Sequence, residues 1–520
     1  MSDSSTSTAG AEGIERIAFV SLGCPKNLVD SEKMLGTLRG AGLTLVPEDG
    51  EPDAIVINTC GFLEASKDES LGVIKEAIAR KEAGELKRVV VAGCLVQRHR
   101  AKMLEWAPGI DAMIGVFDRD HVLDAVRGGP GERDAPTVDG PRYWIAGNAL
   151  QAAKERGRDT VGLTVHGKDG KGLGYFEGDA NRFRLTPRHW AYLRVSEGCN
   201  QRCAFCTIPS IRGKMRSKPL DEIVSEARGL LADGAFELNL IGQDTTSFGM
   251  DIGYAGGLEG MLESLDAAVR DHGDGWLRLM YAYPSTFTDS MIDCLGRLEK
   301  VVKYLDIPLQ HASDRMLKLM RRNVSAGQQR ELLEKLRERI PGMAIRTTFI
   351  TGFPGETDAD HEALVELVRE FGFDMMGVFK YSREDGTPAG TMDEDPELHV
   401  PDEVKLERER ELMLAQQEVA FGNAEYLAER KCQFDVLIDG PAAGGTVGRA
   451  TTGVSKGGSL HVGRAYFQAP QIDSLTYVQS SSSLAAGELV RCTVVASDGY
   501  DLIAQPTEDV GRAVQLKVVR

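Results

Sequence analysis

Three cysteines that follow an apolar run constrain this chain more than any other feature of its sequence. Cys199, Cys203 and Cys206 have the spacing C-x3-C-x2-C and come directly after the apolar segment 190–195, which predicts a β-strand. Three thiolates on one loop can hold three corners of a cubane iron–sulfur cluster and leave the fourth iron open. The spacing therefore predicts a [4Fe–4S] site on a loop at the end of a strand.

Other uses of these cysteines fit the sequence less well. A zinc site would need a fourth protein ligand, and neither His nor Cys follows the third cysteine closely. Three cysteines cannot pair among themselves, and nine cysteines without a secretion signal indicate a reducing compartment. Residues 1–13 are small and polar, so we expect a disordered tail there. No apolar run has membrane-spanning length, and we expect a cytoplasmic protein without a membrane partner.

Strand and helix patterns alternate in the first part of the chain, and three of the apolar runs end in a cysteine. Cys24, Cys60 and Cys94 end the runs RIAFVSLGC, AIVINTC and RVVVAGC, and a helical pattern follows each. This alternation predicts a doubly wound parallel sheet over 14–127, which would bind ligands at the carboxyl ends of its strands. We therefore expect the three cysteines to form a second cluster site, although each could be a small buried residue at a strand end. Three glycines beside them are expected to let the backbone approach a bulky ligand: Gly23, Gly61 and Gly93.

The middle of the chain repeats the strand–helix unit six times. Residues 128–184 are rich in Gly and charge and predict a linker or insertion, to which we assign no function. Residues 185–418 predict a partial (β/α)6 barrel, whose functional groups gather at the carboxyl ends of its strands. Gln243, Asp244 and His311 stand at such ends. For His311 we favour a satisfied loop histidine over a proton-transfer group. The expected strands lie near 190–196, 237–242, 276–283, 302–308, 343–350 and 374–381.

The sequence pattern changes in the last part of the chain, after a long helix rich in charged residues. Residues 419–510 predict the end of that helix and then short strands divided by Gly and Ser turns, which is typical of a small antiparallel β-barrel. Cys294, Cys432 and Cys492 are most simply core residues. The fold class is therefore α/β, with a small β-barrel at the end.

The C-x3-C-x2-C loop resembles that of the radical S-adenosylmethionine (SAM) enzymes. This resemblance implies that the open iron chelates the amino and carboxylate groups of SAM and that Phe205 lies beside its adenine. It also implies that Gln243 and Asp244 contact the SAM amino group, although both could simply cap the following loop. Together with the first three-cysteine domain and a terminal TRAM barrel, the chain resembles the methylthiotransferases.

The methylthiotransferase resemblance implies two [4Fe–4S] clusters and two uses of SAM. The cluster of Cys199, Cys203 and Cys206 would cleave SAM reductively to a radical that removes hydrogen from an unactivated carbon. The cluster of the N-terminal cysteines would carry the sulfur, which a second SAM methylates before its transfer. An electron donor and a sulfur donor are the implied partners. The cofactors would perform the hard chemistry while the protein orients them and excludes water.

The substrate branch is indicated by four stretches of sequence. SLGCPKNLVDSE (Ser21–Glu32), IPSIRG (Ile208–Gly213), LDIPLQHASD (Leu305–Asp314) and APQID (Ala469–Asp473) resemble the branch that modifies an aspartate of a small-subunit ribosomal protein. Acidic residues often stand in that family where this chain has Gln468 and Gln471, which affects details of partner contact. Three basic residues after the cluster loop could bind the substrate or SAM carboxylate, or form a solvated basic face: Arg212, Lys214 and Arg216.

Charge supports the same branch independently. The formal net charge is −17, which suits a basic ribosomal protein better than stable binding of nucleic acid. Between Lys431 and Pro506 there are five basic and six acidic residues, whereas a barrel that grips tRNA phosphates should be basic. A tRNA-adenosine methylthiotransferase of the same architecture is the nearer alternative. A non-enzymatic iron–sulfur sensor or carrier is an alternative that fits the sequence less well, because such a protein would not need the full barrel.

Overall fold

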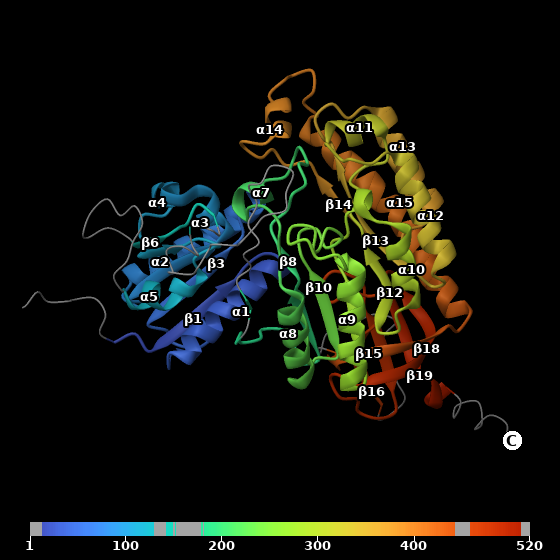
Figure 1. The fold of residues 1–520 in the computed structure, drawn as a ribbon, viewed down its shortest axis with the longest axis horizontal. Coiled ribbons are helices and arrows are strands. Elements are labelled where there is room, and N and C mark those ends of the chain that lie inside the picture. The colour runs from blue at the N-terminus through green and yellow to red at the C-terminus, as the bar shows by residue number, and fades with distance from the viewer. Residues whose placement is uncertain are drawn as a thin grey trace, which may run out of the picture.

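Three parts follow one another along the chain (Figure 1). The computed structural model describes residues 13–128, 142–148, 151, 178–179, 181–442 and 458–510. The expected tail over 1–13, except its last residue, and most of the expected linker over 128–184 lie outside the described residues. None of the helices described is long and apolar enough to cross a membrane.

The N-terminal part is a parallel sheet of six strands in the order β2-β1-β3-β4-β5-β6, so the predicted parallel sheet is confirmed. Alternate residues of β3 face opposite cores: Ile55 and Ile57 pack with α2, α3 and α4, while Ala54 and Val56 pack with α1 and α5. The elements are β1 (Arg16–Ser21), α1 (Pro25–Gly40), β2 (Thr44–Leu45), β3 (Ala54–Thr59), α2 (Glu64–Glu82), β4 (Arg88–Gly93), α3 (Cys94–His99), η1 (Arg100–Lys102), α4 (Met103–Trp106), β5 (Ala112–Ile114), η2 (Arg119–His121), α5 (Val122–Arg127) and β6 (Arg142–Trp144).

The strand order places a ligand-binding edge at one point of this sheet. The chain runs outward from β1 to β2 and then returns to β3 on the other side of β1. A reversal of this kind opens a crevice at the carboxyl ends of the two flanking strands. Cys24 follows β1 and Cys60 follows β3, so two of the three N-terminal cysteines lie at the reversal.

The central part is an open parallel sheet of six strands in the order β14-β13-β12-β11-β10-β7, which confirms the predicted partial barrel. Its convex face packs against helices in a large apolar core, whereas Tyr192, Ile241 and Tyr304 line the concave face. The strands and helices up to β12 are β7 (Trp190–Arg194), β8 (Ser196–Glu197), α7 (Ile208–Ile211), β9 (Arg216–Ser217), α8 (Leu220–Ala232), β10 (Glu237–Ile241), α9 (Gly257–His272), β11 (Trp276–Leu279), η3 (Pro284–Thr286), α10 (Asp289–Arg297) and β12 (Val301–Asp306). The remaining elements are α11 (Asp314–Leu319), α12 (Ala326–Arg339), β13 (Ala344–Thr351), α13 (Asp358–Phe371), β14 (Met375–Lys380), α14 (Pro388–Met392) and α15 (Asp402–Glu429).

The C-terminal part is a closed barrel in the order β15-β16-β17-β19-β18, as the turn-rich sequence predicted. Four of its strand pairs are antiparallel, but β17 and β19 pair in parallel because the β18–β19 hairpin brings β19 back along β17. Cys294 and Cys492 are buried, as expected of core residues, and Cys432 is half-buried. The strands are β15 (Gln433–Pro441), β16 (Ser459–Ala465), β17 (Thr476–Ser480), β18 (Leu489–Asp498) and β19 (Asp501–Pro506).

The concave face of the central sheet is filled from both neighbouring parts. Val29 of α1 and Ala469 of the barrel segment 469–473 belong to the same buried cluster as the strand residues. Tyr304 donates a 2.8 Å hydrogen bond to Asp473. Gln468 is fully buried within the C-terminal part, so it takes no part in a partner surface. The first and last parts are therefore packed onto the central sheet.

Candidate active site

The loop that carries Cys199, Cys203 and Cys206 begins directly after β8 and is held by the main chain of distant segments. The Cys199 amide donates to the carbonyl of Gly213 at 3.2 Å, and the Ala204 amide donates to that of Met320 at 2.9 Å. The Ala204 carbonyl in turn accepts from the amide of Ala389 at 3.0 Å. These contacts fix the main chain of the loop to three segments that are distant in the sequence.

Charged and polar donors surround the sulfurs of this loop. Arg322 Nη1 lies 3.3 Å from Cys203 Sγ, and its guanidinium stacks 4.1 Å from the centroid of the Tyr283 ring. The Gln201 amide donates to Cys199 Sγ at 3.4 Å. Hydrogen bonds of this kind stabilise a thiolate more than a thiol. The loop therefore offers the charge and the donors that a thiolate-bound cluster uses.

The chemistry of the donor set fits an iron–sulfur cluster. Burial raises the pKa of the Cys199 and Cys206 thiols to about 12, and a metal removes the proton from a thiol that it binds. No three Cys, His, Asp or Glu side chains among the described residues close around a single ion. A cubane binds each thiolate through a different iron, so its ligands stand farther apart than those of one ion.

The residues expected to contact SAM lie beside this loop. Phe205 packs edge-on against Phe353, with ring centroids 6.5 Å apart. Phe353 belongs to the TGFPGE stretch (Thr351–Glu356) at the end of β13. Gln243 donates from Nε2 to Glu197 at 2.9 Å, and its Oε1 is buried without a hydrogen-bond partner among the described residues. Asp244 accepts from Gln201 and from two residues of the following loop, Thr246 and Ser247. The contacts of Asp244 are those of a loop cap, whereas Gln243 keeps a free acceptor.

The three N-terminal cysteines lie on neighbouring strand ends. Thr59 of β3 pairs with Gly93 of β4, so Cys60 and Cys94 follow directly paired residues on adjacent strands. A Cβ built on Gly23, where φ is +88°, would lie 3.1 Å from Cys60 Sγ. Burial raises the pKa of Cys94 to about 12. The expected convergence at one sheet edge is therefore found for all three cysteines.

The glycines beside these cysteines lie where segments of the chain pack closely against one another. A Cβ on Gly61 would lie 2.6 Å from the Cα of Leu95, and one on Gly93 would lie 2.3 Å from Asn58 Oδ1. Contacts this close exclude a side chain. The glycines therefore let the cysteine-bearing turns and the neighbouring strand ends approach one another.

The two cysteine sites meet through the segment that follows Cys206. Helix α7 packs Ile211 against Cys94 in a buried cluster that also contains Phe117. Burial raises the pKa of the Cys94 thiol, and the Arg212 guanidinium is the charged group that lowers this pKa most. A segment that begins two residues after one cysteine triple therefore ends against the other.

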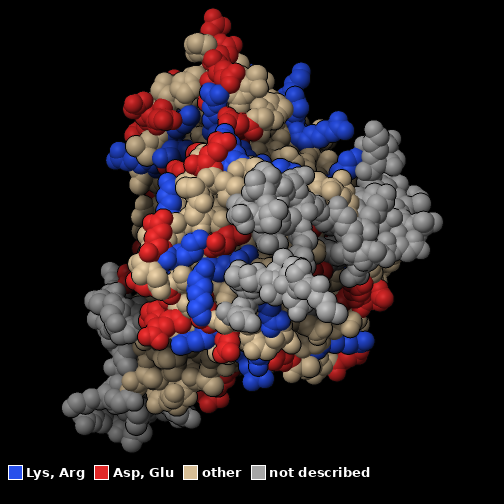
Figure 2. All heavy atoms as spheres, turned by 90° about the vertical axis from the view of Figure 1, so that its left-hand side faces the viewer, with Lys and Arg blue, Asp and Glu red and all other residues tan. Residues whose placement is uncertain are grey.

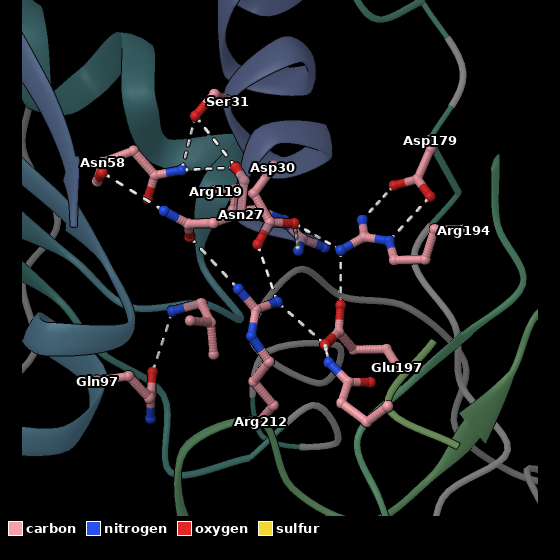
Figure 3. Close-up of polar contacts among 12 residues, drawn as sticks. Asn27, Asp30, Ser31, Asn58, Gln97, Arg119, Asp179, Arg194, Glu197 and Arg212 are labelled. Atoms are coloured by element: carbon pink, nitrogen blue, oxygen red, sulfur yellow. Dashed lines mark hydrogen bonds and ion pairs between the residues drawn. The ribbon is translucent and has the colours of Figure 1, made fainter. Parts of the chain in front are cut away.

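Arg212 belongs to a buried ionic network between the N-terminal and central parts (Figure 3). Asp30 of α1 accepts from Arg119, from Arg194 at 2.6 Å and from Arg212 at 3.0 Å. Glu197 accepts from Arg194 at 2.6 Å and from Arg212 at 3.0 Å. All five residues are at most 7% exposed. Although burial raises the pKa of Glu197, the two guanidiniums hold it well below its usual range.

The basic residues expected to meet a substrate carboxylate are placed differently from one another. Arg212 is 1% exposed and binds carboxylates of this chain, so it is no part of a solvated basic face. Arg216 is buried against the ring of Phe117 and donates to the carbonyls of Arg212 and Lys214. Only Lys214 is exposed. Both arginines are therefore engaged within the chain, because carboxylates and carbonyls from several segments converge on them.

His311 is a satisfied buried histidine, as favoured from the sequence. Its Nδ1 accepts from the amides of Ala312 and Ser313 at 3.0 and 3.1 Å, which leaves the proton on Nε2. Nε2 lies 3.0 Å from Glu356, and Arg408 of α15 binds the same carboxylate at 2.9 Å. The residue joins the TGFPGE stretch to α15 and is fully buried.

Comparisons with known proteins agree with this arrangement. The Radical SAM superfamily matches residues 193–368, Uncharacterized protein family UPF0004 matches 16–115, and the TRAM domain matches 455–506. A relative from Anaeromyxobacter sp. (strain Fw109-5), named ribosomal protein uS12 methylthiotransferase RimO, is 39% identical over 94% of this chain and 92% of its own length. The chain belongs to the RimO family. A RimO protein of Lachnoclostridium phytofermentans is 38% identical over 94% of this chain and 99% of its own.

Family membership identifies the chain as a radical SAM transferase, which binds an iron–sulfur cluster and SAM. Among solved structures, the radical S-adenosylmethionine methyltransferase TsrM from Kitasatospora setae has a TM-score of 0.49 and 16% identity, over 72% of this chain and 75% of that one. A likeness of that size carries no functional argument. The RimO assignment rests on the sequence relatives and on the family matches.

Several residues of the site were not predicted from the sequence. Asp30 and Glu197 hold the arginines of the interface, and Arg322 reaches Cys203 from 119 residues away. Lys26 crosses from α1 to the ring of Tyr281. Lys26 and Asp30 lie inside the SLGCPKNLVDSE stretch, so that stretch was their one signal. No local pattern marks Arg322.

Proposed function

We propose that this chain transfers a methylthio group to the β-carbon of one aspartate of ribosomal protein uS12. The observation that carries the proposal is the meeting of two cysteine triples through α7 and Arg212. A substrate carbon held between them would lie near both, as a reaction that needs two cofactors at one atom requires. The RimO relatives are named for uS12, which supplies the substrate.

Each cysteine triple has its own proposed role. Cys199, Cys203 and Cys206 would hold the [4Fe–4S] cluster that binds SAM, and the N-terminal cysteines would hold a second cluster that carries the sulfur. When bound, these groups supply the reductive cleavage of one SAM, the hydrogen removal and the methylated sulfur. An external electron donor and an external sulfur donor complete the reaction. One carbon–hydrogen bond of the aspartate breaks and one carbon–sulfur bond forms.

The residues around the sites have the tasks of binding, orienting and excluding water. The Oε1 of Gln243, which has no hydrogen-bond partner among the described residues, is suited to accept from the SAM amino group. Phe205 places an aromatic ring on the loop of Cys199, Cys203 and Cys206. Asp244 would support them by holding the loop that follows β10. The network of Asp30, Arg194 and Arg212 would keep the two sites at a fixed separation.

The C-terminal barrel favours a protein substrate over tRNA. One of its five basic residues, Arg464, is 1% exposed and is bound by Glu237 and Asp439, so it is not available to phosphates. On the face that carries the N-terminal part, Lys and Arg alternate with Asp and Glu (Figure 2). With a net charge of −17, the enzyme should attract a basic ribosomal protein, and encounter should slow as salt is added.

The experiment compares three substrates of the reconstituted enzyme: purified uS12, uS12 with the target aspartate changed to Ala, and bulk tRNA. We expect a methylthio mass gain on uS12 alone, located at the aspartate by peptide mass spectrometry. The Ala variant should gain nothing because the acceptor carbon lacks its carboxylate and its position in the site. Methylthiolated adenosine in tRNA, with uS12 unchanged, would contradict the proposal and show that the enzyme modifies tRNA instead.

A further inference from the structure

Lys26 places a positive charge in the interior, at the border of the N-terminal and central parts. It is the second residue of α1, two positions after Cys24, and is 5% exposed. Its Nζ lies 2.9 Å from the centroid of the ring of Tyr281. Tyr281 follows β11, so the ammonium has crossed from the N-terminal sheet to the carboxyl edge of the central sheet.

The ring of Tyr281 is the direct partner of the Lys26 ammonium, whereas the carboxylates of Asp306 and Glu197 act on it only from beyond hydrogen-bonding distance. Within the described ranges, Nζ donates no hydrogen bond and forms no ion pair. The attraction between a cation and an aromatic face offsets only part of the free energy that burying an ion costs. The arginines nearby differ, since Arg194 binds three carboxylates and Arg212 binds two. Lys26 therefore keeps three N–H donors for a group that the chain itself does not supply.

The ring beneath Lys26 is held in an unusual conformation. Tyr281 has a φ of +61°, in the left-handed region that bulky residues rarely adopt. Its amide donates to Asp306 at 3.1 Å, and its carbonyl accepts from the Thr245 amide at 3.1 Å. Strain of this kind persists where the surroundings fix it and gathers at binding sites. The platform under the ammonium is thus rigid and set at the mouth of the barrel.

We expect the anion that forms an ion pair with the Lys26 ammonium to belong to a bound molecule and not to this chain. Arg212 is the charged side chain that lowers the pKa of Cys94 most, so the N-terminal cysteine site has its own cation. Of the three sequence candidates for a substrate carboxylate, Arg212 and Arg216 are occupied within the chain and Lys214 is exposed. Lys26 is a buried cation at the carboxyl edge of the central sheet, and its ammonium donates no hydrogen bond among the described residues.

We propose that Lys26 is the specificity-determining residue that binds the carboxylate of the substrate aspartate. The inference rests on the proposed function and deepens it, because it names the group by which the enzyme selects an acidic side chain. A lysine ammonium can donate two hydrogen bonds to one carboxylate while the third N–H faces the Tyr281 ring. An amide or a nucleobase at that position would leave the buried charge uncompensated.

The test measures binding to uS12 and to uS12 with the target aspartate changed to Asn, by anaerobic calorimetry on the enzyme with both clusters in place. The wild-type enzyme should prefer the Asp form. Lys26→Met should weaken binding of the Asp form about 10- to 100-fold, the size of a lost hydrogen bond to a charged group, and leave the Asn form little changed. Lys26→Arg should restore part of the preference. Lys214→Met, which removes an exposed lysine, should keep all of it.

The remaining outcomes separate the inference from the function on which it rests. Wild-type enzyme that does not bind uS12 overturns both, and wild-type enzyme that binds the Asp and Asn forms equally overturns the inference alone. An Asp preference that survives Lys26→Met, or that disappears in Lys214→Met instead, overturns the inference alone. Weaker binding of SAM by Lys26→Met, with the Asp preference intact, would assign the ammonium to the SAM carboxylate and also overturn it. Iron content and the cluster spectrum show that each variant is folded, and Lys26→Arg carries the test if Lys26→Met loses iron.

Discussion

The two cysteine sites of this protein are built in opposite ways. Cys199, Cys203 and Cys206 share one loop of eight residues, and distant main-chain groups hold that loop in place. Cys24, Cys60 and Cys94 come from three strands and become neighbours only when the N-terminal sheet has formed. The cysteines of the first site are close together in the sequence, and the groups that surround them come from distant parts of the chain. The second is made by the fold itself.

This difference determines what each site needs from its surroundings. The local site receives its charged donor, Arg322, from a loop after α11. The assembled site depends on glycines that allow close turns and on Arg212, which arrives from the other site. Damage to the sheet should therefore disperse the N-terminal cysteines, while the C-x3-C-x2-C loop should keep its ligands together.

The largest expected effect comes from removing the local site. Changing Cys199, Cys203 and Cys206 to Ala should abolish SAM cleavage and remove about half of the iron from enzyme reconstituted to about eight irons, because two cubanes are expected. Iron analysis and chromatography of the nucleoside product measure both. Loss of all iron in this variant, or cleavage at the wild-type rate, would contradict two independent sites.

Removing the assembled site should separate the two halves of the reaction. With Cys24, Cys60 and Cys94 changed to Ala, the enzyme should still form 5′-deoxyadenosine but yield no methylthiolated uS12, since the sulfur carrier is lost. Peptide mass spectrometry and nucleoside analysis of one reaction give both results. A normal yield of modified protein would end the sulfur-carrier role of these cysteines.

How much could be predicted from the sequence follows from the same contrast. Apolar runs that alternate with helical patterns predicted the parallel sheets, and because parallel strands bring their carboxyl ends to one edge, the strand-ending cysteines could be placed together. The internal contacts of Arg212 could not be predicted, because its partners stand 15 and 182 residues away and meet it only in the fold. The parallel pairing of β17 with β19 had no local signal either, since a whole strand separates them. The motif that contains Lys26 could have marked the residue as functional. That its ammonium is buried without an ion-pair partner among the described residues could be learned only from the structure.

The interface between the sites should be the most sensitive point of the fold. Asp30→Ala would leave Arg119, Arg194 and Arg212 without their shared carboxylate, at a cost of about 3–5 kcal/mol for a broken buried pair. Denaturant unfolding of the cluster-loaded enzyme, with hydrogen exchange in α1, measures the loss. The control is Glu51→Ala, which breaks an ion pair whose carboxylate is 91% exposed and should change stability by less than about 0.5 kcal/mol. Equal, small effects of both variants would show that the network does not hold the parts together.

The donor to Cys203 offers a way to change one site and not the other. Arg322→Met removes a hydrogen bond and a positive charge, so the more negative reduced cluster should lose about 1–3 kcal/mol of stabilisation and its midpoint potential should fall. A redox titration followed by electron paramagnetic resonance resolves the two clusters. Its neighbour Arg321, which is exposed, gives the control Arg321→Met with no shift. An equal shift at both clusters would contradict the local role of Arg322.

The smallest expected effect is a pH dependence confined to the assembled site. His99 ends α3, the helix that begins at Cys94, and burial, together with Arg98, Lys67 and Lys102, lowers its pKa to about 4. The unfolded chain binds a proton near pH 6.5, so the stability that neutral His99 provides is complete above that pH and is lost as the pH falls toward 4. Allowing for its partial exposure, we expect a loss of about 1 kcal/mol in this window. Hydrogen exchange in α3 at pH 7 and pH 4.5 should show it, and His99→Gln should remove the difference. A matching change in the loop of Cys199 would mean that acid acts on the whole molecule rather than on the site that the sheet assembles.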